Sequence, residues 1–370
     1  MFIEHFGNIK DPRIERRKLH SLMDILVLSV CAVASGAEGW LGIADFGKEK
    51  LEWLRRFVPL KNGVPSHDCI AYTLSRLNPE EFRGCFTNWV KEITVKTEGE
   101  VIAIDGKTSR GSKDSKNAKS PLHLVSAWAC ANRLVLGQEN TAKKSNEITA
   151  IPKLLALLDV KGCIITIDAM GCQTDIAAQI IEQGGDYSLG LKGNQESLHE
   201  AVEDYFTVAK VANFKAVKYD YAEEIDKEHG RLETRRYWIC EDLTTLPKTE
   251  RWQGLRSIGM VERETIIRDK TMLERRFFIN SFEANAKTFA HAVRSHWGIE
   301  NSLHWRLDVV MREDDCRIRM ANAPAIFAML RHLCLNLFQI ESSKISLKRK
   351  RMKAVLNDDY RANVIFGLAF

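Results

Sequence analysis

The sequence lacks the cysteine and glycine patterns that mark several common classes of protein. No two of its nine cysteines follow a Cys-x-x-Cys spacing, which excludes a zinc ribbon or a thioredoxin-type centre, and an odd number does not complete a disulfide framework. The zinc-protease spacing His-Glu-x-x-His is missing, as are internal repeats and extended low-complexity stretches. Gly106-Lys107-Thr108 is not a P-loop, because the first glycine of that motif would fall at Val101. A nucleotide-binding function is therefore not expected.

The chain also lacks a strong charge of one sign. Its 54 Lys and Arg stand against 49 Asp and Glu, a formal net charge of +5. This balance permits a nucleic-acid partner without requiring one, since local patches set the field that a polyanion feels. The 370 residues predict roughly two domains. Most cysteines have apolar neighbours, as Cys31 and Cys334 do, so we expect free thiols and a reducing, cytoplasmic location.

One apolar run near the start of the sequence is too short for a membrane span. Residues 25–37 follow Arg16, Arg17 and Lys18 and imitate a signal peptide, but the run falls short of the roughly 20 residues that a bilayer requires. Asp24 and Glu38 bracket it, unlike the flanks of a secretory signal. We therefore predict a buried helix and no membrane partner.

The hydrophobic pattern divides the chain into three parts. Residues 1–95 read as helical, with helices at 22–32, near 48–58, from the N-cap Ser66 to about 77, and after Pro79. Residues 96–340 predict a mixed α/β fold in which three strands precede alternating helices and strands, with a β-rich insertion near 210–282. Residues 341–370 form a tail that holds a cluster of six basic residues: Lys344, Lys348, Arg349, Lys350, Arg351 and Lys353. This tail is either a solvated face or a phosphate-binding segment.

Asp105 directly follows the apolar run 101–104, which predicts a buried strand with an acid at its end. Taken alone, Asp105-Gly106 also fits a hairpin turn. The next thirteen residues favour a phosphate-seeking loop, because they contain a single acid, Asp114, and five basic residues: Lys107, Arg110, Lys113, Lys116 and Lys119.

Asp168 has the same setting as Asp105, since it follows the apolar run 164–167. If the two strands are neighbours in one sheet, both carboxylates project from one edge. Carboxylate oxygens are the ligands that Mg²⁺ prefers, and a pair of ions activates an attacking oxygen and stabilises a leaving one. Asp105 and Asp168 are therefore candidate metal ligands.

Glu300 is the candidate for a third acid. In a helix, His296, Glu300 and His304 share one face, although a structural helix with surface histidines fits the same pattern. Gly298 is unfavourable in a helix by about 1 kcal/mol relative to Ala and marks a candidate bend. Four other acids compete for this role: Asp308, Glu313, Asp314 and Asp315.

These acids lie in blocks that resemble the H-repeat-associated proteins, an ISAs-type branch of the bacterial insertion-sequence transposases. The resemblance covers nearly the whole chain, and eight matching blocks occur in order: 11–13, 63–68, 103–108, 144–152, 168–173, 191–195, 229–231 and 296–314. It implies an RNase H-like sheet with flanking helices and an insertion before the last catalytic acid. It also implies a DDE-type DNA transposase that holds two Mg²⁺ or Mn²⁺ ions on Asp105, Asp168 and Glu300.

The implied activity is phosphodiester cleavage at the ends of the element, followed by attack of the freed 3′-hydroxyl on target DNA. The wider insertion-sequence group often carries Tyr-x2-Arg-x3-Glu-x6-Lys around the last acid. Val293, His296 and Leu307 occupy the other three positions here, so only the glutamate matches, and His296 or Arg306 is a candidate to replace the missing cations.

The partners expected from the resemblance are the terminal inverted repeats and target DNA, bound by a homo-oligomer, although no dimerisation zipper is present. Asn194-Gln195 and His229-Gly230-Arg231 also fit simple turns, and the helices at 48–77 are a candidate helix-turn-helix. Two alternatives stay open: an inactive or repurposed DNA-binding protein, and a nuclease without strand transfer. The candidate DNA contacts are Lys107, Arg110, Lys192, Asn194, Gln195, His229, Arg231, His296 and Arg306.

Overall fold

The N-terminal part of the chain is helical, as predicted. The computed structural model describes residues 2–95, 97–114, 120–141, 147–215, 217–228, 230–268 and 270–367. Ser66 and Ser21 cap their helices by accepting hydrogen bonds from backbone N–H groups three residues later. The single helix predicted near 48–58 is wrong, because the chain breaks at Lys50. The helices are α1 Phe2–Phe6, α2 Leu22–Ala34, α3 Trp40–Glu49, α4 Leu51–Leu54, α5 His67–Leu74 and α6 Pro79–Ile93.

A nine-stranded mixed sheet follows, in the order β3-β2-β1-β4-β5-β9-β8-β7-β6. Its first five strands are β1 Val101–Ser109, β2 Leu122–Ala129, β3 Leu134–Thr141, β4 Ile164–Ile167 and β5 Asp186–Leu191. β1, β2 and β3 pair antiparallel, whereas β4 runs parallel to β1 and β5 runs parallel to β4. This is the strand arrangement expected of an RNase H-like sheet, so the predicted fold class is confirmed. The helices α7 Glu147–Leu155, α8 Thr174–Glu182 and α9 Glu196–Val211 occupy the predicted connections.

Asp105 is inside a strand and not at its end. Ile104 pairs with Ile167 in the last step of the β1–β4 ladder, whereas β1 continues to Ser109 along β2. The hairpin-turn alternative for Asp105-Gly106 is therefore wrong, and Lys107 belongs to the strand instead of a loop. Of the other basic residues predicted in that loop, Lys116 and Lys119 lie outside the described residues.

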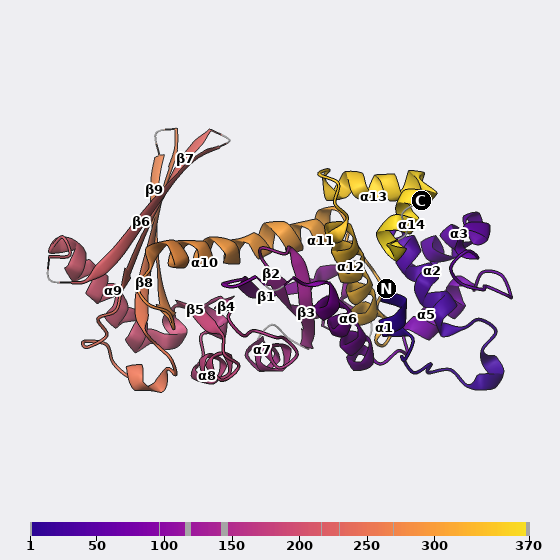
Figure 1. Cartoon of the computed structure of the whole chain (residues 1–370), viewed down its shortest axis with the longest axis horizontal. Helices are drawn as coiled ribbons and strands as arrows, with labels where there is room; N and C mark the ends of the chain where they lie inside the picture. Colours follow the sequence, from indigo (N-terminus) through magenta and orange to yellow (C-terminus); the bar gives the residue numbers. More distant parts are fainter. Residues whose placement is uncertain are drawn as a thin grey trace.

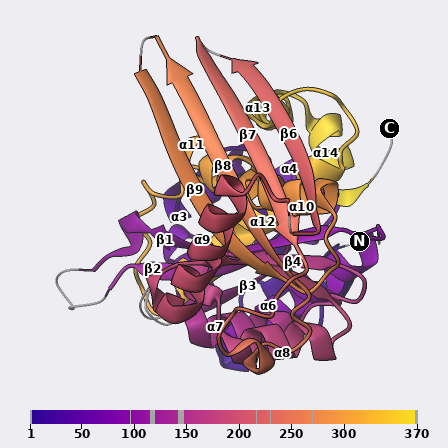
Figure 2. The same cartoon turned by 90° about the vertical axis from the view of Figure 1, so that its left-hand side faces the viewer.

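The insertion contributes four strands to the same sheet: β6 Tyr219–Glu228, β7 Arg231–Cys240, β8 Ser257–Ile267 and β9 Lys270–Asn280. β9 pairs antiparallel with β5, which joins the insertion to the first five strands. Side chains alternate between the two faces of these strands. One face packs on α9 through Phe206 and Phe277, and the other packs on α10 through Tyr237 and Phe289. Figure 2 shows the far ends of the four strands projecting beyond these helices.

A long helical segment connects the insertion with the opposite end of the molecule (Figure 1). It consists of α10 Ala286–Ile299, the π-helical turn η7 Glu300–His304 and α11 Trp305–Val309. Gly298 lies within α10, and the irregularity begins only after it, at Glu300. α10 passes beside β1, β4 and β5, so the end of this helix lies against the middle of the sheet.

The C-terminal residues form helices that pack on the N-terminal ones. α12 Ala323–Ile340 contacts α2, and α13 Leu347–Leu356 precedes α14 Asp358–Phe366. α12 is long and apolar enough to cross a membrane, but 89% of it is buried inside the fold. Two of the six basic residues predicted in a tail point inward, where Lys350 donates to the carbonyl of Phe338 and Arg351 to that of Val33.

Candidate functional site

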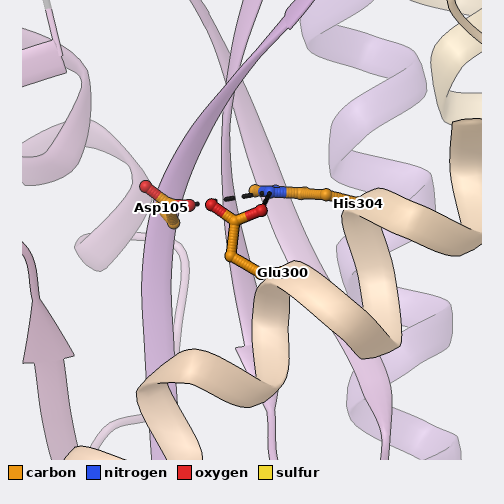
Figure 3. A group of neighbouring side chains, drawn as sticks. All are labelled: Asp105, Glu300 and His304. Carbon is orange, nitrogen blue, oxygen red and sulfur yellow. Dashed lines mark ion pairs between the residues drawn. The ribbon is translucent and has the colours of Figure 1, made fainter. Parts of the chain in front are cut away.

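Three side chains from distant parts of the sequence meet beside the centre of the sheet. The Nδ1 atom of His304 lies 3.6 Å from Oδ2 of Asp105 and 3.6 Å from Oε2 of Glu300. One ligand atom from each of the three residues falls within 4.8 Å of the other two. Figure 3 shows Asp105 on its strand, with Glu300 and His304 reaching toward it from successive turns of one helical segment. Two carboxylates and an imidazole in this arrangement have the donor set of a metal site.

The π-helical turn determines which side chains face Asp105. Its backbone N–H donors bond five residues back, as Trp305 does to Glu300, so side chains rotate relative to an ordinary α-helix. Glu300 remains exposed at the start of this turn, whereas His304 is buried at its end. The sequence pattern placed His304 on the face of Glu300 but did not identify it as a member of the site.

The electrostatic environments of the two acids differ. Burial, together with the charges of Glu300 and Asp168, raises the pKa of Asp105 to about 6, against the opposing effect of His304. The approach of His304 lowers the pKa of Glu300, which stands largely in water. Asp105 is therefore an acid whose charged form needs a nearby cation. A divalent cation would supply that charge, and both carboxylates offer oxygens that Mg²⁺ or Mn²⁺ accepts.

Asp168 lies beside this group and is not part of it. It follows Ile167, whose pairing partner Ile104 precedes Asp105, so the two acids are adjacent in register. Its Oδ1 accepts a hydrogen bond from the N–H of Met170 at 3.0 Å and caps the 3₁₀ turn η4 Ala169–Gly171. A cavity of about 80 Å³ separates Asp168 from α10 and is also lined by His296. Burial lowers the pKa of His296, whose Nδ1 lies 3.1 Å from Thr166 Oγ1.

The other acids considered for the third position have different neighbours. Asp308, Glu313 and Asp314 surround the ammonium of Lys107 at 2.7, 2.9 and 3.4 Å. Asp315 pairs with Arg312 at 3.0 Å. Among these acids, Glu300 alone shares a group with Asp105 in the described part of the chain.

The residues predicted to contact DNA are distributed over several places. Asn194 and Gln195 donate to the carbonyls of Ala169 and Cys172, and so hold the turn that follows Asp168. Lys192 is exposed at the cavity beside Asp168.

The remaining predicted contacts lie farther apart. Arg231 lines a separate groove against α10, and Arg110 is largely exposed near Asp314. Arg306 faces a pocket formed with Lys350 and Arg133. His229 and residues 144–146 of the predicted sequence blocks lie outside the described residues.

Comparisons with known proteins agree with the sequence resemblance. The family described as "Transposase DDE domain" matches residues 96–337, and the family described as "DDE_Tnp_1-associated" matches residues 3–90. The H repeat-associated protein YhhI of Escherichia coli (strain K12) is 43% identical over 99% of this chain and 97% of its own length. YncI of Escherichia coli O157:H7 is also 43% identical, over 98% of this chain and 94% of its own length. Both carry names that describe candidate transposases.

A solved structure is also similar in outline. It is a cryo-EM structure of the piggyBac transposase synaptic complex with hairpin DNA, with a TM-score of 0.45 and 11% sequence identity. The similarity covers 99% of this chain and 78% of that chain. A family match over most of the chain and relatives at 43% identity along its full length lead to one assignment. The chain belongs to the DDE transposases, among the H repeat-associated proteins.

Proposed function

We propose that this protein cleaves phosphodiester bonds at the ends of its own insertion element and joins the freed ends to target DNA. The observation that carries the proposal is the meeting of Asp105, Glu300 and His304 from elements almost 200 residues apart. A half-buried carboxylate with a raised pKa beside a second carboxylate is costly to maintain without a cation. Such groups concentrate at functional sites.

The proposed roles follow from where each side chain lies. Asp105 and Glu300 are the proposed metal ligands of the group, and Asp168, one strand away, is the proposed third carboxylate. His304 touches both acids, so it either completes the ligand set or balances their charge. Two bound divalent ions would activate the attacking oxygen and stabilise the leaving oxygen. The protein itself holds the carboxylates on a rigid sheet and a helical turn that packs against it.

The proposed DNA partners are the inverted repeats of the element and the target duplex. Exposed Lys192 at the cavity beside Asp168 and the arginines near α10 are consistent with a polyanion at this side of the molecule. We propose that residues 1–95 bind the DNA ends of the element and that residues 96–340 form the catalytic region. Residues 341–370 are the proposed supporting region. We also propose that the protein acts as a homo-oligomer on paired DNA ends. Its proposed location is the cytoplasm, without a membrane partner.

The test is cleavage of a duplex that carries the inverted repeats flanking the gene. With Mg²⁺ or Mn²⁺, wild-type protein should nick at the repeat boundary, and pre-cut ends should yield strand-transfer products. Asp105→Asn, Asp168→Asn and Glu300→Gln should each reduce cleavage by at least about 100-fold, the loss expected when a group that stabilises developing charge is removed.

Asp315→Asn is the matched control, because this rival acid pairs with Arg312 away from the group. Normal cleavage by Asp105→Asn would overturn the proposal. DNA binding without nicking would favour a repurposed binding protein, and nicking without joined products would favour a nuclease.

A further inference from the structure

A groove of about 330 Å³ lies between the inserted strands and α10, away from the three-residue group. Within the described part of the chain, its lining carries more positive than negative charge. Five arginines line it against three acids, Asp226, Glu233 and Glu274. The arginines come from three neighbouring strands and from the helix: Arg231, Arg235, Arg263, Arg276 and Arg294.

Two of these arginines face each other across adjacent strands. Arg235 on β7 is the register partner of Arg263 on β8, and like charges directly opposite destabilise a sheet. Burial lowers the pKa of the Arg235 guanidinium, and the charges of Arg294 and Arg263 add to this effect. Arg263 and Arg276 share one carboxylate, that of Glu274. The groove therefore concentrates positive charge at a cost to the stability of the sheet.

The opposite face of the same strands is balanced. There, Glu262 receives ion pairs from Lys210 and Arg275, at 2.7 and 2.9 Å. Arg236 pairs with Glu223 and Glu264, at 3.1 and 2.8 Å. Consecutive residues of a strand point to opposite faces, so Arg235 and Arg236 differ mainly in the face they occupy. On the face that meets α10, Glu233 pairs with both Arg231 and Arg235, and Glu224 pairs with Arg294. Four groove arginines therefore share the carboxylates of Glu233 and Glu274, and the excess of positive charge lies on this face.

The groove continues toward the acids. Arg276, Val293 and Trp297 line both the groove and the cavity that contains Asp168. The guanidinium of Arg276 lies 4.1 Å from the centre of the partly exposed Trp297 ring, which holds it at the junction of the two spaces. The groove and the cavity beside Asp168 are therefore neighbouring spaces that share these three side chains.

We propose that this arginine groove binds a stretch of DNA phosphodiester backbone adjoining the phosphate that reacts at the acids, an inference that rests on the proposed function. Guanidinium groups fit phosphate oxygens in a forked geometry and keep their charge at all physiological pH values. Arginines spaced over three strands match a repeating polyanion better than a single small anion. The contact is to the backbone, so it reads no base sequence.

Binding is tested on the full chain in EDTA, which removes catalysis from the measurement. The probe is a fluorescein-labelled duplex of roughly 30 base pairs and arbitrary sequence, followed by anisotropy over a range of salt concentrations. Arg263→Gln/Arg294→Gln removes two charges from the groove, while Glu274 keeps Arg276 and Glu224 keeps the hydroxyl of Tyr237 as partners. Arg236→Gln/Arg275→Gln removes two charges from the opposite face, while Glu262 keeps Lys210.

The groove variant should bind the duplex about tenfold more weakly than the wild type. Its plot of log K against log salt concentration should be less steep by about two units, close to one unit for each lost phosphate contact. Its melting temperature should change little, since relief of the repulsion between Arg235 and Arg263 offsets the loss of the Arg263–Glu274 and Arg294–Glu224 ion pairs. The control variant should keep the wild-type affinity and slope. Equal losses in both variants, or no loss in the groove variant, would overturn the inference.

The two proposals fail in different ways. Wild-type protein that binds the duplex through the groove but never cleaves repeat ends in Mg²⁺ would leave the inference intact and refute the proposed function. Cleavage by wild-type protein, together with unchanged binding by Arg263→Gln/Arg294→Gln, would refute the groove and leave the proposed function intact.

Discussion

The ammonium of Lys107 lies 2.9 Å from Oε2 of Glu313, a carboxylate with no exposure to solvent. Lys107 is two residues beyond Asp105 on β1, and Glu313 follows the helical segment that carries Glu300. Asp308 and Asp314 bind the same ammonium. This ion cluster therefore fixes the two halves of the site relative to each other.

Replacing Lys107 should destabilise the fold strongly. Lys107→Met would leave buried Glu313 without its main cation, and breaking a buried ion pair from one side costs about 3–5 kcal/mol. Urea denaturation measures the loss in the free energy of unfolding. Lys113→Met removes an exposed lysine of the same region and should change stability by less than about 0.5 kcal/mol. Similar values for both variants would contradict the role given to the cluster.

Replacing Gly106 and Gly298 by alanine should change the stability of the fold in opposite directions. A Cβ at Gly106 would lie 2.7 Å from Nε2 of His123, inside the buried His123–Glu147 pair, so Gly106→Ala should cost about 1–3 kcal/mol and reduce cleavage. A Cβ at Gly298 meets no described atom within 4 Å in helix α10, so Gly298→Ala should stabilise by about 1 kcal/mol. Thermal denaturation of both variants checks the two signs, and a stabilising Gly106→Ala would show that the strand has room there.

His304 should set the metal requirement of the enzyme. Because its Nδ1 lies 3.6 Å from both acids, His304→Asn should raise the Mg²⁺ or Mn²⁺ concentration for half-maximal cleavage by about 10–100-fold. His291→Asn changes an exposed histidine on α10 and is the control. A metal titration that is the same for His304→Asn and wild type would remove this residue from the site.

Glu341 should stabilise the C-terminal helices in a pH-dependent way. Despite some burial, hydrogen bonds and ion pairing from Ser343, Lys350 and Tyr360 hold the pKa of Glu341 at about 2. A carboxyl with a depressed folded-state pKa contributes stability above its unfolded pKa of about 4.3 and loses it as pH falls toward 2. Glu341→Gln should therefore lower the melting temperature at pH 7, and the difference from wild type should shrink below about pH 4. A difference that is constant from pH 7 to pH 3 would contradict this.

The order of elements in the first five strands could be predicted because each buried strand is a short apolar run bounded by turns. The extent of β1 could not. Its second half, from Asp105 to Ser109, is polar and becomes a strand only because β2 pairs with it. The strand β6 has no apolar run in the sequence for a similar reason, since its residues are mostly charged or polar and one edge of the strand is unpaired in the sheet order.

The site was partly predictable. Asp105 and Asp168 follow matching apolar runs, and the condition that their two strands be neighbours in one sheet is met. The spacing of four residues placed His304 on the face of Glu300, but the π-helical turn that carries both side chains leaves no clear signal in the sequence. The partners of Lys107 lie about 200 residues away in the sequence and could not be foreseen. Lys107 was predicted to contact phosphate, but in the fold carboxylates surround its ammonium.

The helix α10 carries the groove residue Arg294 and, at its end, the carboxylate of Glu300. Six residues at 1.5 Å each separate them by about 9 Å along the axis, close to the rise of three nucleotides in one DNA strand. The helix therefore sets the distance between the proposed backbone-binding groove and the proposed cleavage site. A one-residue insertion between Arg294 and Glu300 would turn Glu300 away from Asp105 by about 100°. It should abolish cleavage and leave DNA binding by the groove unchanged.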